Sequence, residues 1–325
     1  MGTLYVDRRG SELDFERGAL VLRVPDAPPR SVPLSLVDRL VVIGNVRLNS
    51  GLLVRLADQG AALAILPGRG RRRGAFLFAD GHGDVVRRLG QYRLGVEAPL
   101  CAPWARRIVY LRLAGQRRLL RVAHRMRPDC RRPLLAAEQA VAAAAAKLRE
   151  EAPDLESLRG REGAAAAAFF RGYVSLFPPS VGFSGRNRRP PKDPVNAALS
   201  LGYTLAHSDA LRAVVGAGLD PGIGVYHQPA WSRESLACDL VELARGRVER
   251  FVWRLFADRV VTAGGFSDGE EGVRLNKGAR AAYFAAWEAQ AQLHRRWQAR
   301  MAHALAKECR SLGETGAVEG GADEP

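Results

Sequence analysis

The stretch RLVVIGNVRLNSGLLVRLADQGAALAIL, residues 39–66, decides the fold of the first part of the chain. Its ends are short apolar runs, RLVVIG at 39–44 and AALAIL at 61–66, which predict strands. Between them, NSGLLVRLADQG at 49–60 predicts a helix with Asn49 or Ser50 as its N-cap and Gly60 at its end. The stretch therefore predicts a helix set between strands.

Other short strands are predicted around this stretch. They lie at 4–6, 13–15, 19–24, 46–48 and 75–78, and Gly, Pro, Asn and Asp bound them as they usually bound strands. Together these segments predict a small β-rich N-terminal domain over residues 1–88.

From about residue 95 the apolar residues recur at helical spacing instead. Helices are predicted over 102–126, 136–151, from near Glu162, 195–218, 232–258 and 276–310. The predicted fold class is therefore α+β, with a larger all-α C-terminal domain over 95–310 that carries the active site. The Gly-rich, acidic segment 311–325 is predicted to be disordered.

Composition indicates a globular protein without a membrane-spanning helix. The 325 residues exceed one ordinary core, 47% are hydrophobic and 26% are charged. Arginines interrupt every apolar run before the ~20 residues that a membrane helix needs. The start, MGTLYVDRRG, lacks the apolar region of a signal peptide, so a cytoplasmic location is expected. The four cysteines are too far apart for a zinc framework or a disulfide scaffold.

The charge of the chain predicts a polyanionic partner. Lys and Arg total 49 against 34 acidic residues, which gives a net charge of +15. Residues 101–135 hold ten arginines and one acid, Asp129, and such a concentration of charge favours contact with phosphate. Nucleic acid is the expected partner, and an anionic membrane surface is the weaker alternative.

The segment GVYHQPAWSRESLACDLVEL, residues 224–243, brings a histidine close to two acids. Asp239 and Glu242 stand at i and i+3 of the predicted helix, on one face, and Ser232 is its predicted N-cap. Carboxylates with an imidazole suit Mg²⁺ or Mn²⁺, and the histidine favours Mn²⁺. Spacing alone leaves an ordinary loop histidine, His227, and surface acids as the alternative.

The motif Y-H-Q-P followed by R-x-S-L-A-x-D-L-x-E in this segment resembles the signature of the CRISPR adaptation integrase family, whose members insert new spacers into a CRISPR array. GREGAAAAAFF at 160–170 and GRNRRPPKDPVNAALSLGY at 185–203 resemble two further blocks of that family. The resemblance extends over nearly the whole chain. It implies a β-rich front domain through which two copies pair, and a helical catalytic domain behind it.

The resemblance also implies the site residues. Glu162, His227, Asp239 and Glu242 match the family's catalytic metal ligands, and it stays open whether Glu242 binds the metal directly or through water. The implied cofactor is Mg²⁺ or Mn²⁺, and the implied reaction is attack of a DNA 3′-hydroxyl on a repeat phosphodiester. The same site with water as the nucleophile is an endonuclease. A general-base role for His227 is the less favoured alternative.

The implied partners are double-stranded and branched DNA, a second copy of the chain and the small partner subunit of the adaptation complex. The alternatives are a metal-dependent nuclease for branched DNA in repair and a non-catalytic DNA-binding scaffold. The predicted phosphate contacts are basic residues from three segments: Arg106, Arg107, Arg117, Arg118, Arg186, Arg188, Arg189, Lys192 and Arg233.

Overall fold

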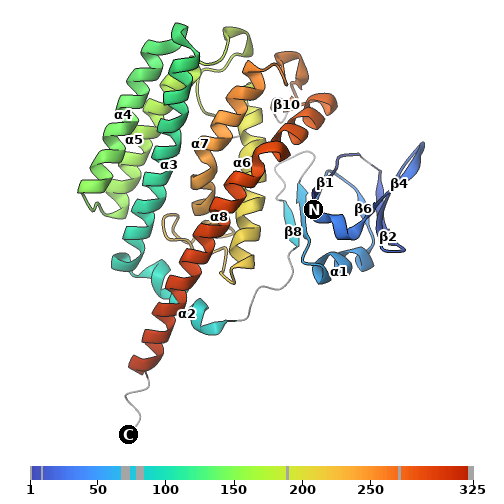
Figure 1. Ribbon diagram of the computed structural model, residues 1–325, viewed down its shortest axis with the longest axis horizontal. Helices are drawn as coiled ribbons and strands as arrows, with labels where there is room; N and C mark the ends of the chain where they lie inside the picture. Colours follow the sequence, from blue (N-terminus) through green and yellow to red (C-terminus); the bar gives the residue numbers. More distant parts are fainter. Residues whose placement is uncertain are drawn as a thin grey trace. The chain divides into compact units, whose positions relative to one another are not determined.

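The computed structural model describes residues 2–8, 10–66, 74–77, 84–187, 190–269 and 272–320, with side chains up to 315. The chain divides into two compact units, residues 1–82 and 83–325. Figure 1 shows strands in the first unit and long helices in the second. The predicted α+β class, with strands first and helices after, is confirmed.

The strands of the first unit form two sheets. One has the order β1-β5-β7-β8 and the other the order β4-β3-β2-β6. Strand β5 pairs in parallel with both β1 and β7, while β2, β3 and β4 pair antiparallel. The bounds are β1 Gly2–Val6, β2 Glu12–Glu16, β3 Ala19–Val24, β4 Ala27–Pro33, β5 Val37–Ile43, β6 Arg47–Leu48, β7 Ala62–Leu66 and β8 Ala75–Leu77.

Helix α1 (Ser50–Asp58) joins the parallel strands β5 and β7, as a crossover between parallel strands requires. The Asn49 side chain caps it by accepting from the Gly51 N–H at 2.7 Å. Leu52 and Leu56 on its inner face are fully buried and join the core of this unit with Leu13 and Leu40. The quoted stretch thus folds as its sequence predicts.

Strand β4 (Ala27–Pro33) is the strand of the first unit that the sequence analysis missed. Its sequence, APPRSVP, has three prolines, which argue against a strand inside a sheet. The strand order places β4 at the edge, where it pairs with β3 alone. An edge strand tolerates proline because one side of its backbone has no partner.

Helix α7 lies at the centre of the second unit, in contact with α3, α6 and α8 (Figure 1). Helices α4 and α5 pack on each other and on α3, and α2 packs along α8. The bounds are α2 Val85–Val96, α3 Ala98–Met126, α4 Arg131–Glu150, α5 Leu155–Val174, α6 Pro194–Gly216, α7 Ser235–Ala257 and α8 Lys277–Gly320. A short hairpin, β9 Phe266–Ser267 and β10 Arg274–Leu275, precedes α8.

The α3 and α7 backbones approach closely at two glycines. A Cβ on Gly246 would lie 2.5 Å from the Gly115 carbonyl carbon, a distance that real atoms do not adopt. A Cβ on Gly115 would meet Gly246 at 3.8 Å, an ordinary contact. Gly246 therefore sets the spacing of these helices.

Several predicted boundaries differ from those observed. Helix α2 begins at Val85, so the helical unit starts before residue 95, because the Asp84 side chain caps it through the Arg87 N–H. Helix α5 begins at Leu155, capped by Asp154, which places Glu162 in mid-helix. Helix α7 begins at Ser235. Ser232 is not its N-cap, because this residue lies in a turn before the helix and has a φ of 55°.

The end of the chain also differs from the prediction. Residues 277–310, predicted as separate helices, belong to the single helix α8, which runs on to Gly320 where a disordered tail was predicted from 311. Residues 321–325 of that predicted tail lie outside the described residues. Leu305, Ala306 and Cys309 near its end are buried, and this part of α8 packs against α2. None of the described helices is long and apolar enough to cross a membrane.

Candidate active site

Helix α7 carries three acidic side chains into the interior of the helical unit. Asp239, Glu242 and Glu249 are 0%, 2% and 0% exposed. The helix is in contact with α3, α6 and α8, which cover most of its surface. A buried carboxylate costs free energy unless donors or cations meet it, so the partners of each one define its role.

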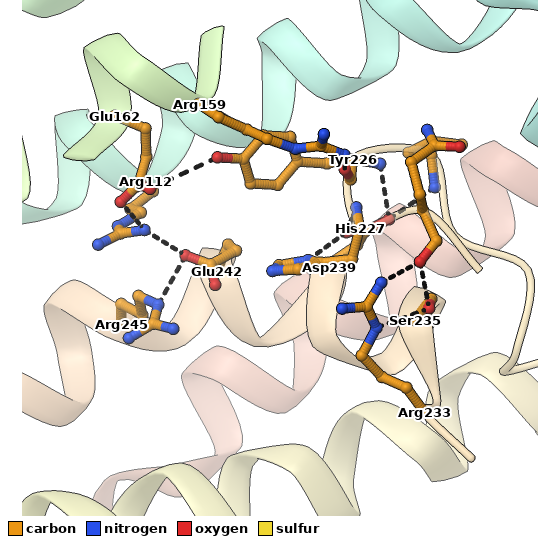
Figure 2. A network of polar contacts seen from close by, with 12 residues as sticks. Arg112, Arg159, Glu162, Tyr226, His227, Arg233, Ser235, Asp239, Glu242 and Arg245 are labelled. Carbon is orange, nitrogen blue, oxygen red and sulfur yellow. Dashed lines mark hydrogen bonds and ion pairs between the residues drawn. The ribbon is translucent and has the colours of Figure 1, made fainter. Parts of the chain in front are cut away.

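The Asp239 carboxylate holds the loop that precedes α7. Its Oδ2 accepts from the Val225 N–H at 2.7 Å and the Tyr226 N–H at 3.0 Å. Its Oδ1 accepts from the His227 N–H at 2.8 Å and lies 2.7 Å from the ring Nδ1. Gly224 permits this approach, because a Cβ there would lie 2.8 Å from Oδ2. Asp239 therefore turns Nδ1 of His227 inward, and Nε2 is the nitrogen directed away from it (Figure 2).

The carboxylates of Glu162 on α5 and Glu242 on α7 meet at one guanidinium. Arg112 on α3 forms an ion pair with Glu162 and contacts Glu242 Oε2 at 2.9 Å. Arg245, one turn further along α7, donates from Nε to the same oxygen at 2.6 Å. Burial raises the pKa of Glu242, but the two arginines outweigh it and hold that pKa at about 2. Glu242 is therefore a carboxylate at neutral pH.

Tyr226 connects these two pairs of residues (Figure 2). Its hydroxyl donates to Glu162 Oε2 at 3.4 Å, and its ring packs edge-on against the His227 ring at 5.0 Å. Burial raises the pKa of Tyr226, so the hydroxyl keeps its proton and remains a donor. The four residues predicted from the sequence thus lie in one network, with His227 on Asp239 and Glu162 near Glu242.

The donor set fits a hard divalent cation. Glu162, Glu242 and His227 offer carboxylate oxygens and one imidazole nitrogen, and Arg112 shows that a cationic group is accommodated between the two glutamates. Among the residues that the structure describes, no three His, Cys, Asp or Glu side chains are already grouped as a metal site. A metal bound here would therefore have to compete with Arg112 for the glutamates.

Arg112 and Arg245 are site residues that the sequence analysis missed. Arg112 was counted in the basic run 101–135, yet its side chain is 7% exposed. The position of Arg112 in the sequence could have indicated burial, because Ile108 and Gln116, one turn before and after it, are buried on the same face of α3. An arginine on the buried face of a helix needs an acidic partner, whatever the charge around it.

A pocket of about 330 Å³ adjoins His227. Its walls are Arg159, Tyr226, His227, Gln228 and Arg233. Arg159, on α5 one turn before Glu162, donates to the Tyr226 carbonyl at 3.2 Å and is otherwise exposed. The sequence analysis did not single it out.

The predicted phosphate contacts differ in their surroundings. Arg107, Arg118, Lys192 and Arg233 have exposed side chains. Arg117 is exposed but ion-paired with Glu138 at 2.9 Å, and Arg106 donates to the Glu151 carbonyl.

Arg186 is half-buried and held inside the protein. It donates to Asn196 Oδ1 at 2.7 Å and lies over the Tyr203 ring at 5.5 Å. The structure favours an internal role for this residue over a surface contact. Arg188 and Arg189 lie outside the described residues.

Taken together, a strand-rich unit and a helical unit with a buried acid–histidine network define a two-unit α+β protein with an enzyme-like site. The family model described as "CRISPR associated protein Cas1" matches residues 4–289. The chain belongs to this family, and the resemblance inferred from its motifs is confirmed.

Known relatives agree with this assignment. The CRISPR-associated endonuclease Cas1 1 of Thermodesulfovibrio yellowstonii is 34% identical over 91% of this chain and 93% of the relative. A solved Cas1 protein from Thermotoga maritima superposes with a TM-score of 0.81 at 22% identity, over 95% of this chain and 97% of that one. A casposase bound to its integration product gives a TM-score of 0.78 at 19% identity, over 95% and 91%. These two structures share the fold of this chain.

Proposed function

We propose that the protein is a metal-dependent DNA integrase and endonuclease that inserts new spacer DNA into a CRISPR array. The observation that carries this proposal is the convergence of Glu162, His227 and Glu242, which come from three separate segments. The named relatives are endonucleases, and the proposal extends that activity to this chain.

Glu162, Glu242 and Nε2 of His227 are the proposed ligands of Mg²⁺ or Mn²⁺. Asp239, expected as a fourth ligand, is better suited to fixing the His227 ring, because its oxygens already accept three main-chain N–H groups and face Nδ1. The metal, when bound, supplies charge that polarises a phosphate oxygen and stabilises the attacking and leaving oxygens.

The chain's own residues then position the DNA. A 3′-hydroxyl oxygen forms a bond to the phosphorus of a repeat phosphodiester as the bond to the departing 3′-oxygen breaks, so one ester replaces another without a nucleotide energy source. The exposed Arg159 and Arg233 beside His227 suit the charge of the phosphates. Arg112 and Arg245 keep Glu242 ionised for its role.

The proposal includes partners. Double-stranded and branched DNA are the proposed substrates in the cytoplasm, two copies of the chain are proposed to pair, and a small Cas2-type subunit is proposed to join them. Chains of this fold occur in a Cas6-RT-Cas1–Cas2 complex, 23% identical with a TM-score of 0.79, and in a Cas1–DNA complex, 19% identical with a TM-score of 0.58. These complexes support the proposed DNA substrate and the proposed Cas2-type partner.

A joining assay on branched DNA tests the proposal. The wild type with Mn²⁺ is expected to transfer strands and to lose this activity in EDTA. His227→Ala and Glu242→Gln are expected to abolish it, and Arg300→Met, at an exposed position of α8, to retain it. Cutting without joining, with the partner subunit present, would favour a branched-DNA nuclease. Full activity of both site variants would favour a different catalytic site.

A further inference from the structure

Tyr203 on α6 contacts the arginine that holds one of the proposed metal ligands. The guanidinium carbon of Arg245 lies over the Tyr203 ring, 4.9 Å from its centre, and Nε of Arg245 donates to Glu242 Oε2 at 2.6 Å. An aromatic face attracts a cation, most strongly where water is excluded. The Arg245 side chain is only 15% exposed, so solvent weakens this attraction little. Tyr203 and Glu242 therefore hold the same guanidinium.

The Tyr203 ring is itself fixed by a buried acid that lies outside the proposed ligand set. Its hydroxyl donates to Glu249 Oε1 at 2.9 Å, and burial raises the pKa of Tyr203, so the hydroxyl keeps its proton. The Gln116 amide donates to both oxygens of Glu249, at 3.0 and 3.1 Å. Side chains from α3, α6 and α7 thus meet at Glu249, and they anchor the ring at its hydroxyl end.

Arg245 has a particular importance for Glu242 once a metal binds. In the metal-free protein, Arg112 and Arg245 both contact Glu242 Oε2, at 2.9 and 2.6 Å (Figure 2). If Arg112 gives way to a divalent cation, Arg245 is left to orient this carboxylate. The charge of the metal also repels Arg245, so the arginine needs a further contact to stay in place. The Tyr203 ring supplies such a contact.

We propose that Tyr203 is a positioning residue of the metal site, which holds Arg245 so that Arg245 orients the Glu242 carboxylate toward the cation. The inference rests on the proposed function, since Glu242 is a metal ligand there. It also gives a role to Glu249 and Gln116, two buried polar residues that the proposed reaction does not use, because they anchor the ring. Outer partners of this kind orient metal ligands without touching the metal.

Two substitutions separate the ring of Tyr203 from its hydroxyl. Tyr203→Leu removes the ring but leaves the charges of Arg245 and of every proposed ligand unchanged. It is expected to weaken Mn²⁺ binding roughly 5- to 30-fold, the equivalent of about 1–2 kcal/mol for a cation–π contact with little solvent around it. Tyr203→Phe keeps the ring and is expected to keep most of the Mn²⁺ affinity, although it loses stability with the hydrogen bond to Glu249. Isothermal titration of the full-length protein measures the affinities, and urea unfolding in EDTA measures the stabilities.

A double substitution tests the route through Arg245. Arg186 also lies over the Tyr203 ring, at 5.5 Å, so the loss of the ring alone does not identify the route. In an Arg245→Met background, Tyr203→Leu is expected to leave Mn²⁺ affinity unchanged, because the contact that it breaks is already gone. Phe256→Leu is the matched control, because this half-buried aromatic residue of α7 packs against Phe177. It is expected to lower stability without changing Mn²⁺ affinity.

Wild-type Mn²⁺ affinity in folded Tyr203→Leu would overturn the positioning role. An equal loss of affinity on Tyr203→Leu with and without Arg245 would also overturn it, because the ring would then act by another route. So would equal losses in Tyr203→Leu and Tyr203→Phe, which would assign the effect to the hydroxyl. Absence of Mn²⁺ binding by the wild type would overturn the proposed function and this inference with it, so the two failures give different results.

Discussion

Nδ1 of His227 lies 2.7 Å from Oδ1 of Asp239, a carboxylate that is fully buried. The same oxygen accepts the main-chain N–H of His227, so one carboxylate fixes both the backbone and the ring of this residue. The ring can present only Nε2 to a ligand. A carboxylate behind a metal-binding histidine sets its tautomer and orientation, and such partners matter nearly as much as the ligands.

Asp239→Asn is expected to lower Mn²⁺ affinity and strand transfer about 10- to 100-fold, because an amide has one oxygen for four donors. Isothermal titration with Mn²⁺ and the joining assay measure the two effects. The control is Asp220→Asn, which changes an acid in the same segment whose Oδ1 accepts from the Gly222 N–H. Wild-type metal affinity in Asp239→Asn would show that the His227 ring is held by other means.

Arg112→Met is expected to destabilise the metal-free protein by about 3–5 kcal/mol, because it leaves the Glu162 and Glu242 carboxylates without their shared cation. Mn²⁺ is expected to restore part of the loss by taking that place. Thermal unfolding in EDTA and in Mn²⁺ measures both effects, with Arg118→Met as the exposed control on the same helix. An equal response to Mn²⁺ in the variant and the wild type would contradict competition between Arg112 and the metal.

Gly246→Ala is expected to cost about 1–3 kcal/mol of unfolding free energy, because the added methyl group would overlap the α3 backbone at Gly115. Gly115→Ala is its matched control, because a Cβ there has room, and it is expected to be neutral or to stabilise by up to about 1 kcal/mol through helix propensity. Urea unfolding measures both variants. Equal destabilisation by the two would mean that the helices separate freely at this crossing.

Glu249→Gln tests a buried acid outside the proposed ligand set. Burial raises the pKa of Glu249, although the Gln116 amide and the Tyr203 hydroxyl donate to it. The folded protein thus holds this proton to a higher pH than the unfolded chain, whose glutamates titrate near pH ~4.3. The stability linked to the proton is complete below that pH and declines as the pH rises through the folded pKa.

The glutamine variant has no such proton to lose. Its unfolding free energy relative to the wild type is therefore expected to rise with pH above about 4.3 and to stay level below it. Urea unfolding across a pH series measures the difference, with the exposed Glu156→Gln as control. A difference that is constant across the series would contradict a raised pKa.

The sequence predicted those parts of the molecule that depend on local patterns. The strands, α1 and the convergence of Asp239 with Glu242 on one helix face follow from spacing within a single segment. Glu162 was found only through resemblance, because a glutamate in mid-helix on α5 has no local feature that separates it from a solvated one. Its partner Arg112 comes from α3, and only the packing of these helices brings the two together.

The different roles of Asp239 and Glu242 also could not be predicted from the sequence. Both are buried acids on α7, one turn apart. Their roles differ because the loop at 225–227 folds back onto Asp239, while Arg112 and Arg245 reach Glu242. Hydrogen-bond partners between distant segments are set by tertiary structure, and residue spacing does not encode them directly.

The edge strand β4 has a consequence for self-association of the first unit. Pro28 and Pro29 are consecutive, and neighbouring residues of a strand direct their N–H groups to opposite sides. Neither proline has an N–H, so the outer side of β4 lacks a donor that an incoming strand from another chain needs. The sheet is therefore less open to extension along β4 than it would be beside a strand that keeps all its N–H groups.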